Sequence, residues 1–361
     1  MRTRMEWSFV VVIALMGGAN LGGGGEARGD SPMFLGGPTH IPKTESLTLP
    51  DQLFATSRFR CKGGILAPPA LVKGVLYLGS SEGTLYALDL TTGTTPWEFR
   101  TTFDLRSSPA LDETGVYVGC ADGRLYCVDR ETGKPTWEIW TEEPVYGSPC
   151  VCEGVVYVGS MSGKLYATDA SNGGVLWEFQ ARGGIVSSLA VYEGMVYFGT
   201  AGNRICCLST RDGGLIREMQ TRDKVDASPV IADGVVYVGS WAGTMYALDA
   251  LTGAVVWEYP TAGRPIHSPV AVGPEKAFFG GVDRRLYAVD RQEETTPWRL
   301  QASDSIYGAP LLVGNRLCFG DGVGVFWSLS AVDGRGLAQV ATRRGRTEQH
   351  AYARYDYGAY H

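Results

Sequence analysis

The chain has 361 residues and a net charge of −6 at neutral pH, so it offers no basic field to a phosphate backbone, and nucleic acid is not an expected partner. Its 49 glycines, four histidines and 19% charged residues describe a chain of turns and apolar strands rather than a helical enzyme. We therefore expect an all-β protein.

The first 29 residues have the layout of an export signal followed by a flexible junction. Arg2 and Arg4 precede the apolar stretch Trp7–Met16, and small residues follow at 17–19, with a glycine run at 22–25. The apolar stretch is too short to span a bilayer comfortably, which disfavours a membrane anchor. We expect cleavage near Ala19, no transmembrane span in the mature chain, and a periplasmic or secreted protein.

A lead-in at residues 30–56 precedes an internal repeat of 40 residues. The repeat is marked by strings such as VYVG, with tyrosines at Tyr77, Tyr117, Tyr157, Tyr197 and Tyr237. A sixth copy, AFFG at Ala277–Gly280, follows a one-residue insertion, and a seventh is LCFG at Leu317–Gly320. A period of about 40 residues predicts a single β-propeller, and seven copies predict seven blades.

Each copy contains four short apolar segments separated by glycine turns. In the second copy these predict strands at Leu105–Leu111, Gly115–Gly119, Arg124–Asp129 and Thr136–Ile139. Glycine after an aspartate, as at Asp122-Gly123, supplies the positive φ that a tight hairpin needs. We therefore expect four-stranded blades.

A tryptophan occupies one fixed place in five of the copies. These residues are Trp97, Trp137, Trp177, Trp257 and Trp298. An aromatic side chain at one position per blade suits packing between neighbouring sheets, and this structural role is favoured over a cofactor role. Arg217 and Ala338 take the place in the fourth and seventh copies, so those two junctions are expected to be weaker or differently filled.

The segment Ser107–Glu138 resembles the repeat of the pyrroloquinoline-quinone-like (PQQ-like) propeller superfamily with its tryptophan-docking motif. The superfamily includes the outer-membrane protein assembly lipoproteins and the quinoprotein dehydrogenases. The resemblance covers residues 57–340 and, through Met33–His40, a lead-in found before the first blade. It implies a closed propeller with the tryptophan on the last strand of a blade, and eight-bladed relatives make eight blades the alternative.

The ends of the repeat region suggest how the ring closes. Phe59 aligns with Phe99 and Phe179, so Ser57–Arg60 is predicted to add a strand to the seventh blade and remove an exposed sheet edge. The propeller is then expected at residues 57–341. The tail at residues 342–361 has neither helical nor strand periodicity, and we expect it to be disordered.

Ligand candidates lie at the entry to the innermost strand of each blade, where the copies differ. Three residues before the repeated proline, or next to that position, are Arg106, Tyr146, Asp226, His267 and Tyr307. When the residue at one structural position differs from blade to blade, a ring of similar blades acquires an asymmetric binding site. The alternative is that these side chains are only wet channel-mouth residues, with Arg106 and Asp226 balancing each other's charge.

No catalytic or metal-ligating constellation is predicted. The adjacent cysteines Cys206 and Cys207 are reminiscent of a disulfide found in quinoprotein dehydrogenases, but they align with Tyr86-Ala87 inside a strand, where alternate side chains face opposite ways. The eight cysteines permit disulfides, although buried free thiols are favoured. No cofactor is expected, and PQQ with calcium is the disfavoured alternative.

The sequence favours a non-enzymatic protein-interaction or scaffold module of the cell envelope, with envelope or extracellular proteins as partners. One alternative is a binding protein for a quinone, a sugar or another small molecule. A PQQ-dependent oxidoreductase is a further alternative that the sequence disfavours, because the residues for catalysis are not evident.

Overall fold

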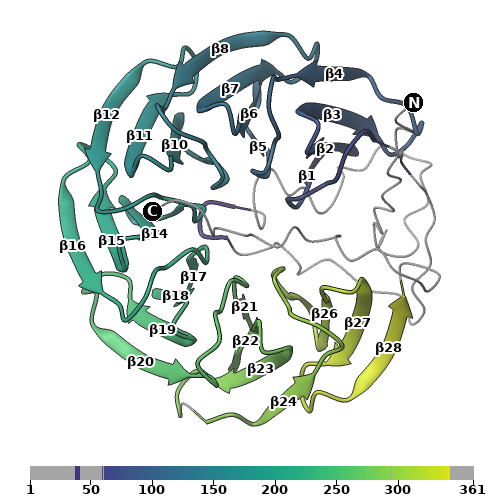
Figure 1. Cartoon of the computed structure of the whole chain (residues 1–361), viewed down its shortest axis with the longest axis vertical. Coiled ribbons are helices and arrows are strands. Elements are labelled where there is room, and N and C mark those ends of the chain that lie inside the picture. The colour runs from purple at the N-terminus through teal and green to yellow at the C-terminus, as the bar shows by residue number, and fades with distance from the viewer. Residues whose placement is uncertain (1–36, 41–58, 60, 294, 342–361) are drawn as a thin grey trace, which may run out of the picture.

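Seven antiparallel sheets surround a common centre in the computed structural model, which describes residues 37–40, 59, 61–293 and 295–341 (Figure 1). This part of the chain contains 28 strands and no helix, and every sheet consists of four strands that are consecutive in the sequence. The predicted all-β fold with seven four-stranded blades is confirmed. We number the blades 1 to 7 in chain order.

Within each blade the strands run in order from the centre outward. The innermost strands are β1 (Ala70–Val72), β5 (Ala110–Leu111), β9 (Cys150–Cys152), β13 (Ala190–Tyr192), β17 (Val230–Ala232), β21 (Ala271–Val272) and β25 (Leu311–Val313). The second strands are β2 (Val75–Gly79), β6 (Gly115–Gly119), β10 (Val155–Gly159), β14 (Met195–Thr200), β18 (Val235–Gly239), β22 (Lys276–Gly280) and β26 (Arg316–Gly320). The third strands are β3 (Thr84–Asp89), β7 (Arg124–Asp129), β11 (Lys164–Asp169), β15 (Arg204–Ser209), β19 (Thr244–Asp249), β23 (Arg285–Asp290) and β27 (Val325–Ser330). The outermost strands are β4 (Trp97–Arg100), β8 (Pro135–Trp140), β12 (Val175–Gln180), β16 (Leu215–Gln220), β20 (Val255–Pro260), β24 (Trp298–Gln301) and β28 (Gly336–Ala341).

In blade 2 the predicted strands at Gly115–Gly119 and Arg124–Asp129 have the observed bounds, whereas the predicted first strand begins five residues too early. Two local features end the ladder before Ala110. Pro109 has no N–H to donate, and the Ser107 hydroxyl takes the place of a strand partner, because Oγ accepts from Gly119 N–H at 2.9 Å and lies 3.0 Å from Gly119 O. The segment before β5 is therefore a loop.

The core lies between neighbouring blades because alternate side chains of a strand point to opposite faces of its sheet. In β6, Val116 and Val118 pack with Tyr77 and Trp97 of blade 1. Tyr117, between them in sequence, packs with blade 3. Each blade thus buries both faces only in contact with its neighbours, as expected for a repeat protein.

Four serines at 40-residue intervals tie the centres of blades 2 to 5 together. The backbone N–H of each of the first three donates to the hydroxyl of the next, at 3.0 Å for Ser108 to Ser148, 3.1 Å for Ser148 to Ser188 and 3.0 Å for Ser188 to Ser228. These bonds satisfy buried N–H groups that lie beyond the strand ladders.

In blades 1 to 6 a glycine at or next to the end of the second strand allows close approach of the loop that leads to the next blade. A Cβ at Gly159 would lie 2.3 Å from Cγ2 of Ile185, a buried residue of the loop that leads to blade 4. We therefore expect Gly159→Ala to lower the free energy of unfolding by about 1–3 kcal/mol through overpacking. Urea denaturation measures the change, with Gly308→Ala as the control because nothing lies within 4 Å of its Cβ position. An equal effect of both substitutions would contradict this assignment.

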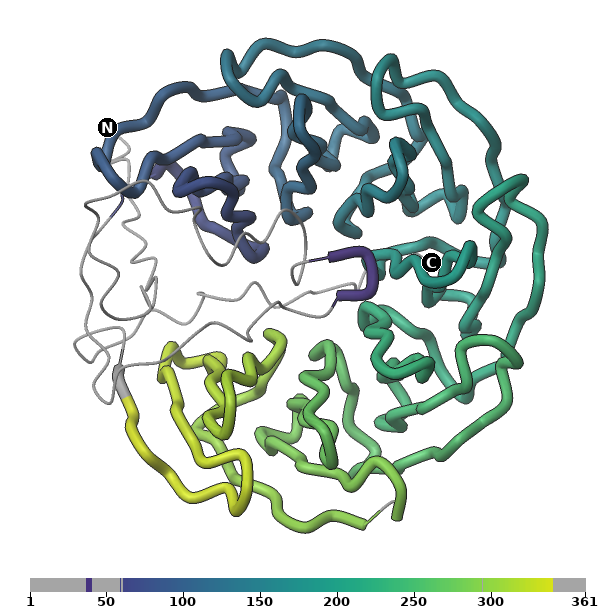
Figure 2. Tube along the Cα trace, turned by 180° about the vertical axis from the view of Figure 1, so that it is seen from behind, coloured from purple at the N-terminus to yellow at the C-terminus, as the bar shows by residue number. Residues whose placement is uncertain are grey.

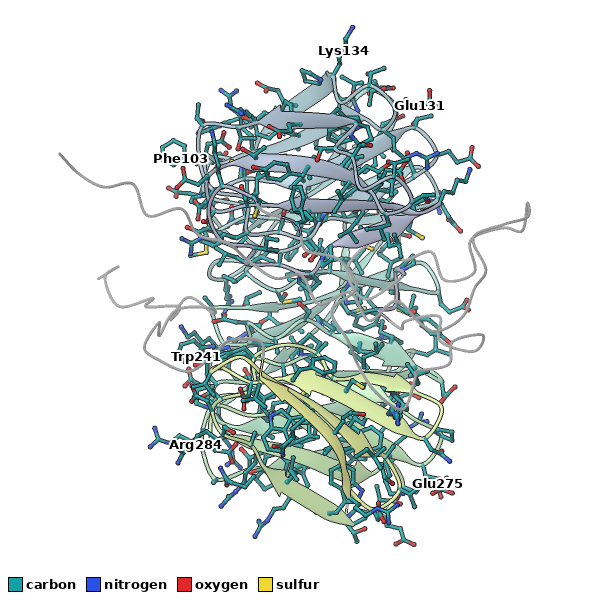
Figure 3. The ribbon with its side chains drawn as sticks, turned by 90° about the vertical axis from the view of Figure 1, so that its right-hand side faces the viewer. Phe103, Glu131, Lys134, Trp241, Glu275 and Arg284 are labelled. Carbon is teal, nitrogen blue, oxygen red and sulfur yellow. The ribbon has the colours of Figure 1, made fainter. Side chains whose placement is uncertain are left out.

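The two faces of the ring carry different connections. Figure 3 shows Phe103, Trp241 and Arg284 on one face, which holds the loops joining consecutive blades and the turns between second and third strands. Glu131 and Glu275 lie on the opposite face, which holds the remaining turns. We call the first of these the crossover face.

Blades 1 and 7 flank an arc in which no strand of the described residues lies (Figure 1). Of the predicted closing strand Ser57–Arg60 only Phe59 is described, and its ring packs edge-on against Tyr86 of blade 1, with centroids 5.4 Å apart. The closing strand stays a prediction. The export signal, the rest of the lead-in and the tail at 342–361 lie outside the described residues.

Candidate functional site

All five ligand candidates lie on crossover-face loops that lead into innermost strands, and the structure brings them together in two groups. The first group joins blades 2 and 3. Arg106 forms an ion pair with Asp104 of its own loop, and its guanidinium carbon lies 5.2 Å from the ring centre of Tyr146. A cation held over an aromatic face in this way fixes both side chains at the channel mouth.

The second group joins blades 5, 6 and 7 and contains Asp226, His267 and Tyr307. The His267 ring lies between two aromatic rings, with its centroid 4.9 Å from Trp241 in an edge-on arrangement and 5.9 Å from Tyr307. Lys224 places its ammonium 3.4 Å from the Trp241 ring centre and 3.8 Å from Asp226 Oδ2. Asp226 is thus paired within its own loop rather than with Arg106, so the idea that these two balance each other's charge is wrong.

Burial controls the protonation of this second group. It raises the pKa of Asp226, while the Lys224 ammonium and the Trp241 indole act in the opposite direction. Burial also lowers the pKa of His267 to about 4, and the nearby Lys224 charge adds to that decrease. At neutral pH the group therefore presents a neutral imidazole between two aromatic rings and beside one ion pair, which suits binding of a flat or polar group.

Sequence reasoning missed Lys224 and Trp241. Lys224 lies two residues before Asp226, and Trp241 belongs to the turn between β18 and β19. The available signal was chemical: Trp241 is aromatic, whereas the first four copies carry non-aromatic residues at this place, namely Ser81, Ala121, Met161 and Ala201.

The innermost strands of blades 4 and 5 bind a segment of the chain's own lead-in. Figure 2 shows the turn of residues 37–40 at the centre of the ring, beside β13 and β17. Pro38 O accepts from Val191 N–H at 2.8 Å, and Thr39 O accepts from Ile231 N–H at 2.9 Å. His40 is buried, with Nδ1 2.6 Å from Pro229 O. Sequence reasoning placed this segment before the first blade and did not foresee the contact.

The five tryptophans make one repeated contact with the following blade. Each indole N–H donates to a backbone carbonyl near the turn that precedes the next blade's outermost strand. The pairs are Trp97 with Arg130 (3.0 Å), Trp137 with Ala170 (3.0 Å), Trp177 with Thr210 (2.9 Å), Trp257 with Arg291 (3.1 Å) and Trp298 with Val332 (3.1 Å). This geometry gives each tryptophan a position between blades.

Arg217 fills the tryptophan place between blades 4 and 5 in a different way. Its Nη1 donates to Ala250 O at 3.2 Å, and its Nη2 donates to Leu251 O. The aliphatic stem lies over Gly253, as the indoles lie over the turn glycines of other blades. This junction is differently filled, as one of the two sequence-based alternatives anticipated.

Among the described residues, the crossover-face loops that lead into the innermost strands do not fit a quinone with a metal ion. The carboxylates of Asp104 and Asp226 are paired with Arg106 and Lys224, and the described residues contain no group of three His, Cys, Asp or Glu side chains placed to hold a metal. Cys206 and Cys207 are free and pack on opposite sides of blade 4, against blades 3 and 5 respectively.

The outer circumference of blades 3, 4 and 5 carries a set of exposed aliphatic side chains, which we call the apolar rim. Two such residues begin each outermost strand, and their side chains are 43–55% exposed. They are Val175, Leu176, Leu215, Ile216, Val255 and Val256. Blades 1, 2 and 6 carry threonine and proline at these positions, so the repeat itself does not require the apolar pairs.

Comparison with known proteins agrees with this architecture. A family model described as outer membrane protein assembly factor BamB matches residues 56–148 and 138–269, more than half of the chain. No curated protein sequence matches significantly. In the described residues no helix is long and apolar enough to cross a membrane.

Solved structures with the same fold include BamB and dehydrogenases. BamB from Moraxella catarrhalis has a TM-score of 0.69 at 18% identity, covering 77% of this chain and 88% of that one. The quinohemoprotein alcohol dehydrogenase from Comamonas testosteroni has a TM-score of 0.68 at 17% identity, covering 78% and 67%. A europium-containing methanol dehydrogenase has a TM-score of 0.74 at 14% identity, covering 88% and 86%. At such low identity these likenesses establish the fold alone.

Proposed function

The chain belongs to the family of the outer membrane protein assembly factor BamB, and from that premise we propose that it is a non-enzymatic protein-interaction module of the cell envelope. The export signal expected at residues 1–29 is part of this proposal, because it delivers the propeller to the periplasm or the exterior. The observation that carries the proposal is the apolar rim.

The rim supports an interaction role because three consecutive blades each expose two aliphatic side chains at the start of the outermost strand, and exposed apolar surface of this kind marks binding sites. Its chemistry also indicates the kind of partner. On the exposed faces of the same strands lie Glu178, Glu218 and Glu258. Two of these carboxylates form ion pairs: Glu178 lies 3.6 Å from the Lys164 ammonium, and Glu218 lies 2.6 Å from Arg204 Nε. A protein surface with exposed aliphatic side chains is the complement of the rim, with a basic side chain placed opposite Glu258.

We expect the double substitution Leu215→Ser with Ile216→Ser to reduce co-purification of envelope proteins with the chain by at least about tenfold, the loss expected when central apolar contacts are removed. Both side chains are exposed, so folding is preserved, and an unchanged melting temperature checks this. Quantitative mass spectrometry of affinity-purified samples gives the ratio.

The control for that experiment is Val332→Ser, which changes an equally exposed aliphatic residue on blade 7, outside the rim. It is expected to retain the partner. If the double variant binds as well as the wild type, if Val332→Ser loses binding equally, or if the wild type repeatedly yields no partner, the proposal fails.

A second candidate function is binding of a small molecule at the channel mouth, favoured by the group of Asp226, His267 and Tyr307 with Lys224 and Trp241. We expect a sugar or quinone that stabilises the wild type in a thermal-shift panel to lose its effect on Arg106→Ala with Asp226→Ala. A panel that gives the same shifts for both proteins removes this candidate. Because the mouth residues do not fit a quinone with a metal ion, oxidation of a substrate is not part of this candidate function. Dye reduction after adding PQQ with calcium would overturn that view.

A further inference from the structure

The lead-in turn is bound to the channel wall by contacts that repeat from one blade to the next. Val191 and Ile231, the residues whose N–H groups bond to Pro38 O and Thr39 O, are 40 residues apart and occupy equivalent places in β13 and β17. Two consecutive carbonyls of the turn therefore cap the same N–H position in two adjacent blades. This is recognition of the backbone along exposed strand edges.

His40 adds a side-chain contact that is specific. Its ring lies against the carbonyls of Leu189 and Pro229, which are again equivalent residues of the two blades, with Nδ1 2.6 Å from Pro229 O. The residue is 1% exposed, and its φ of 62° is in the left-handed region, stabilised by the bond from His40 N–H to Gly37 O at 2.9 Å. An unfavourable backbone conformation is held here by burial of the imidazole and by its hydrogen bond.

The wall departs from the repeat at this place. Six of the seven equivalent positions are proline, and Leu189 is the exception. The edge formed by blades 4 and 5 therefore differs from the edges of the other blade pairs at one of the two residues that His40 contacts. This difference distinguishes the binding position of the turn from the equivalent positions on the other blades.

We propose that the channel-facing edge of β13 and β17 is a binding site for a peptide turn, with Gly37–His40 as its built-in occupant. The site takes a segment that offers two consecutive backbone carbonyls followed by an imidazole, as in Pro-Thr-His. A partner segment of this chemistry binds by displacing the lead-in, which acts as an intramolecular competitor. The site lies on the channel wall rather than on the apolar rim, and it stands whether or not the rim binds a partner.

Amide hydrogen exchange by NMR on the full chain tests the site, and the repeat supplies a matched reference. Val151 occupies in β9 the place that Val191 and Ile231 occupy in the next two blades. We expect the Val191 and Ile231 amides to exchange at least about tenfold more slowly than the Val151 amide. His40→Ala is expected to remove this difference, whereas Thr39→Ala, which keeps the bonding carbonyl, retains it.

The decisive step adds a peptide in trans. The probe is Gly-Gly-Pro-Thr-His-Ile-Pro, the sequence of residues 36–42. We expect it to restore slow exchange at Val191 and Ile231 in His40→Ala, and the same peptide with alanine for histidine to fail. Equal exchange at Val191, Ile231 and Val151 in the wild type overturns the proposal without any variant. Failure of the histidine peptide to restore protection, or equal restoration by both peptides, also overturns it. The melting temperature of each variant confirms that it is folded.

Discussion

Trp257→Ala is expected to lower the free energy of unfolding by about 3–5 kcal/mol, the range for removing a large buried aromatic side chain. Trp257 is 2% exposed, its ring lies 5.8 Å from that of Tyr237, and its indole N–H bonds to Arg291 O of blade 6. The substitution therefore leaves a cavity between blades 5 and 6 and an unpaired carbonyl beside it. Urea denaturation, followed by circular dichroism, measures the loss.

Trp140→Ala is the control for this prediction, because Trp140 is 59% exposed and its ring centre lies 6.0 Å from the guanidinium carbon of Arg124. Its loss is expected to stay below about 1 kcal/mol. Similar losses for the two variants would mean that the tryptophans do not connect blades as described. Unfolding of Trp257→Ala in more than one transition would also fit the account, because the blades of a repeat protein unfold separately where the junction between them is weakened.

Stability is expected to fall as the pH is lowered from about 6.5 to about 4, because burial lowers the pKa of both His40 and His267 to about 4. Between the ordinary histidine pKa and that value the unfolded chain binds protons that the folded chain does not, so protonation favours unfolding. Each histidine contributes up to about 3 kcal/mol to this loss. Asp226 acts in the opposite direction, since burial raises its pKa.

Denaturation midpoints at a series of pH values measure the effect in the wild type and in His267→Gln. The variant removes one of the two titrations, so its stability should depend less steeply on pH over the same window. A wild type whose stability is level from pH 6.5 to 4, or a variant with an unchanged slope, would contradict the burial of a neutral His267.

Much of the scaffold was predictable because it repeats. The strings around Tyr117 and the tryptophans at a fixed phase gave the blades, and the observed bounds of β6 and β7 match those predicted. The start of β5 was predicted too early, because the replacement of strand bonding by the Ser107 hydroxyl depends on its contact with Gly119. The periodicity of the repeat predicts where strands pair, but it does not predict which side chains replace the backbone hydrogen bonds of a strand.

The site was less predictable because its contacts cross long stretches of sequence. Arg106, Asp226 and His267 were identified from variation among the copies, but Lys224 and Trp241 became apparent only once the loops were placed side by side. The contact of His40 with Pro229 spans 189 residues and follows no period. The pattern of the repeat cannot predict where a segment outside the repeat, such as the lead-in, binds.

A common principle connects the apolar rim, the Arg217 junction and the lead-in turn. Each involves residues of blades 3 to 5 that differ from those at equivalent positions of the other blades. These differences change the chemistry of the surface or junction without changing the fold. The fold is shared by BamB and by an alcohol dehydrogenase, so the function of this chain has to be found in such departures.

The most direct test of the interaction role is photo-crosslinking in cells that make the protein, with a photoreactive phenylalanine placed in turn at residues 176, 216 and 256 of the rim and at residue 136, the equivalent place on blade 2. The account predicts the same protein adduct from all three rim positions and none from residue 136. Adducts of equal yield from residue 136, or none from any rim position, would contradict it.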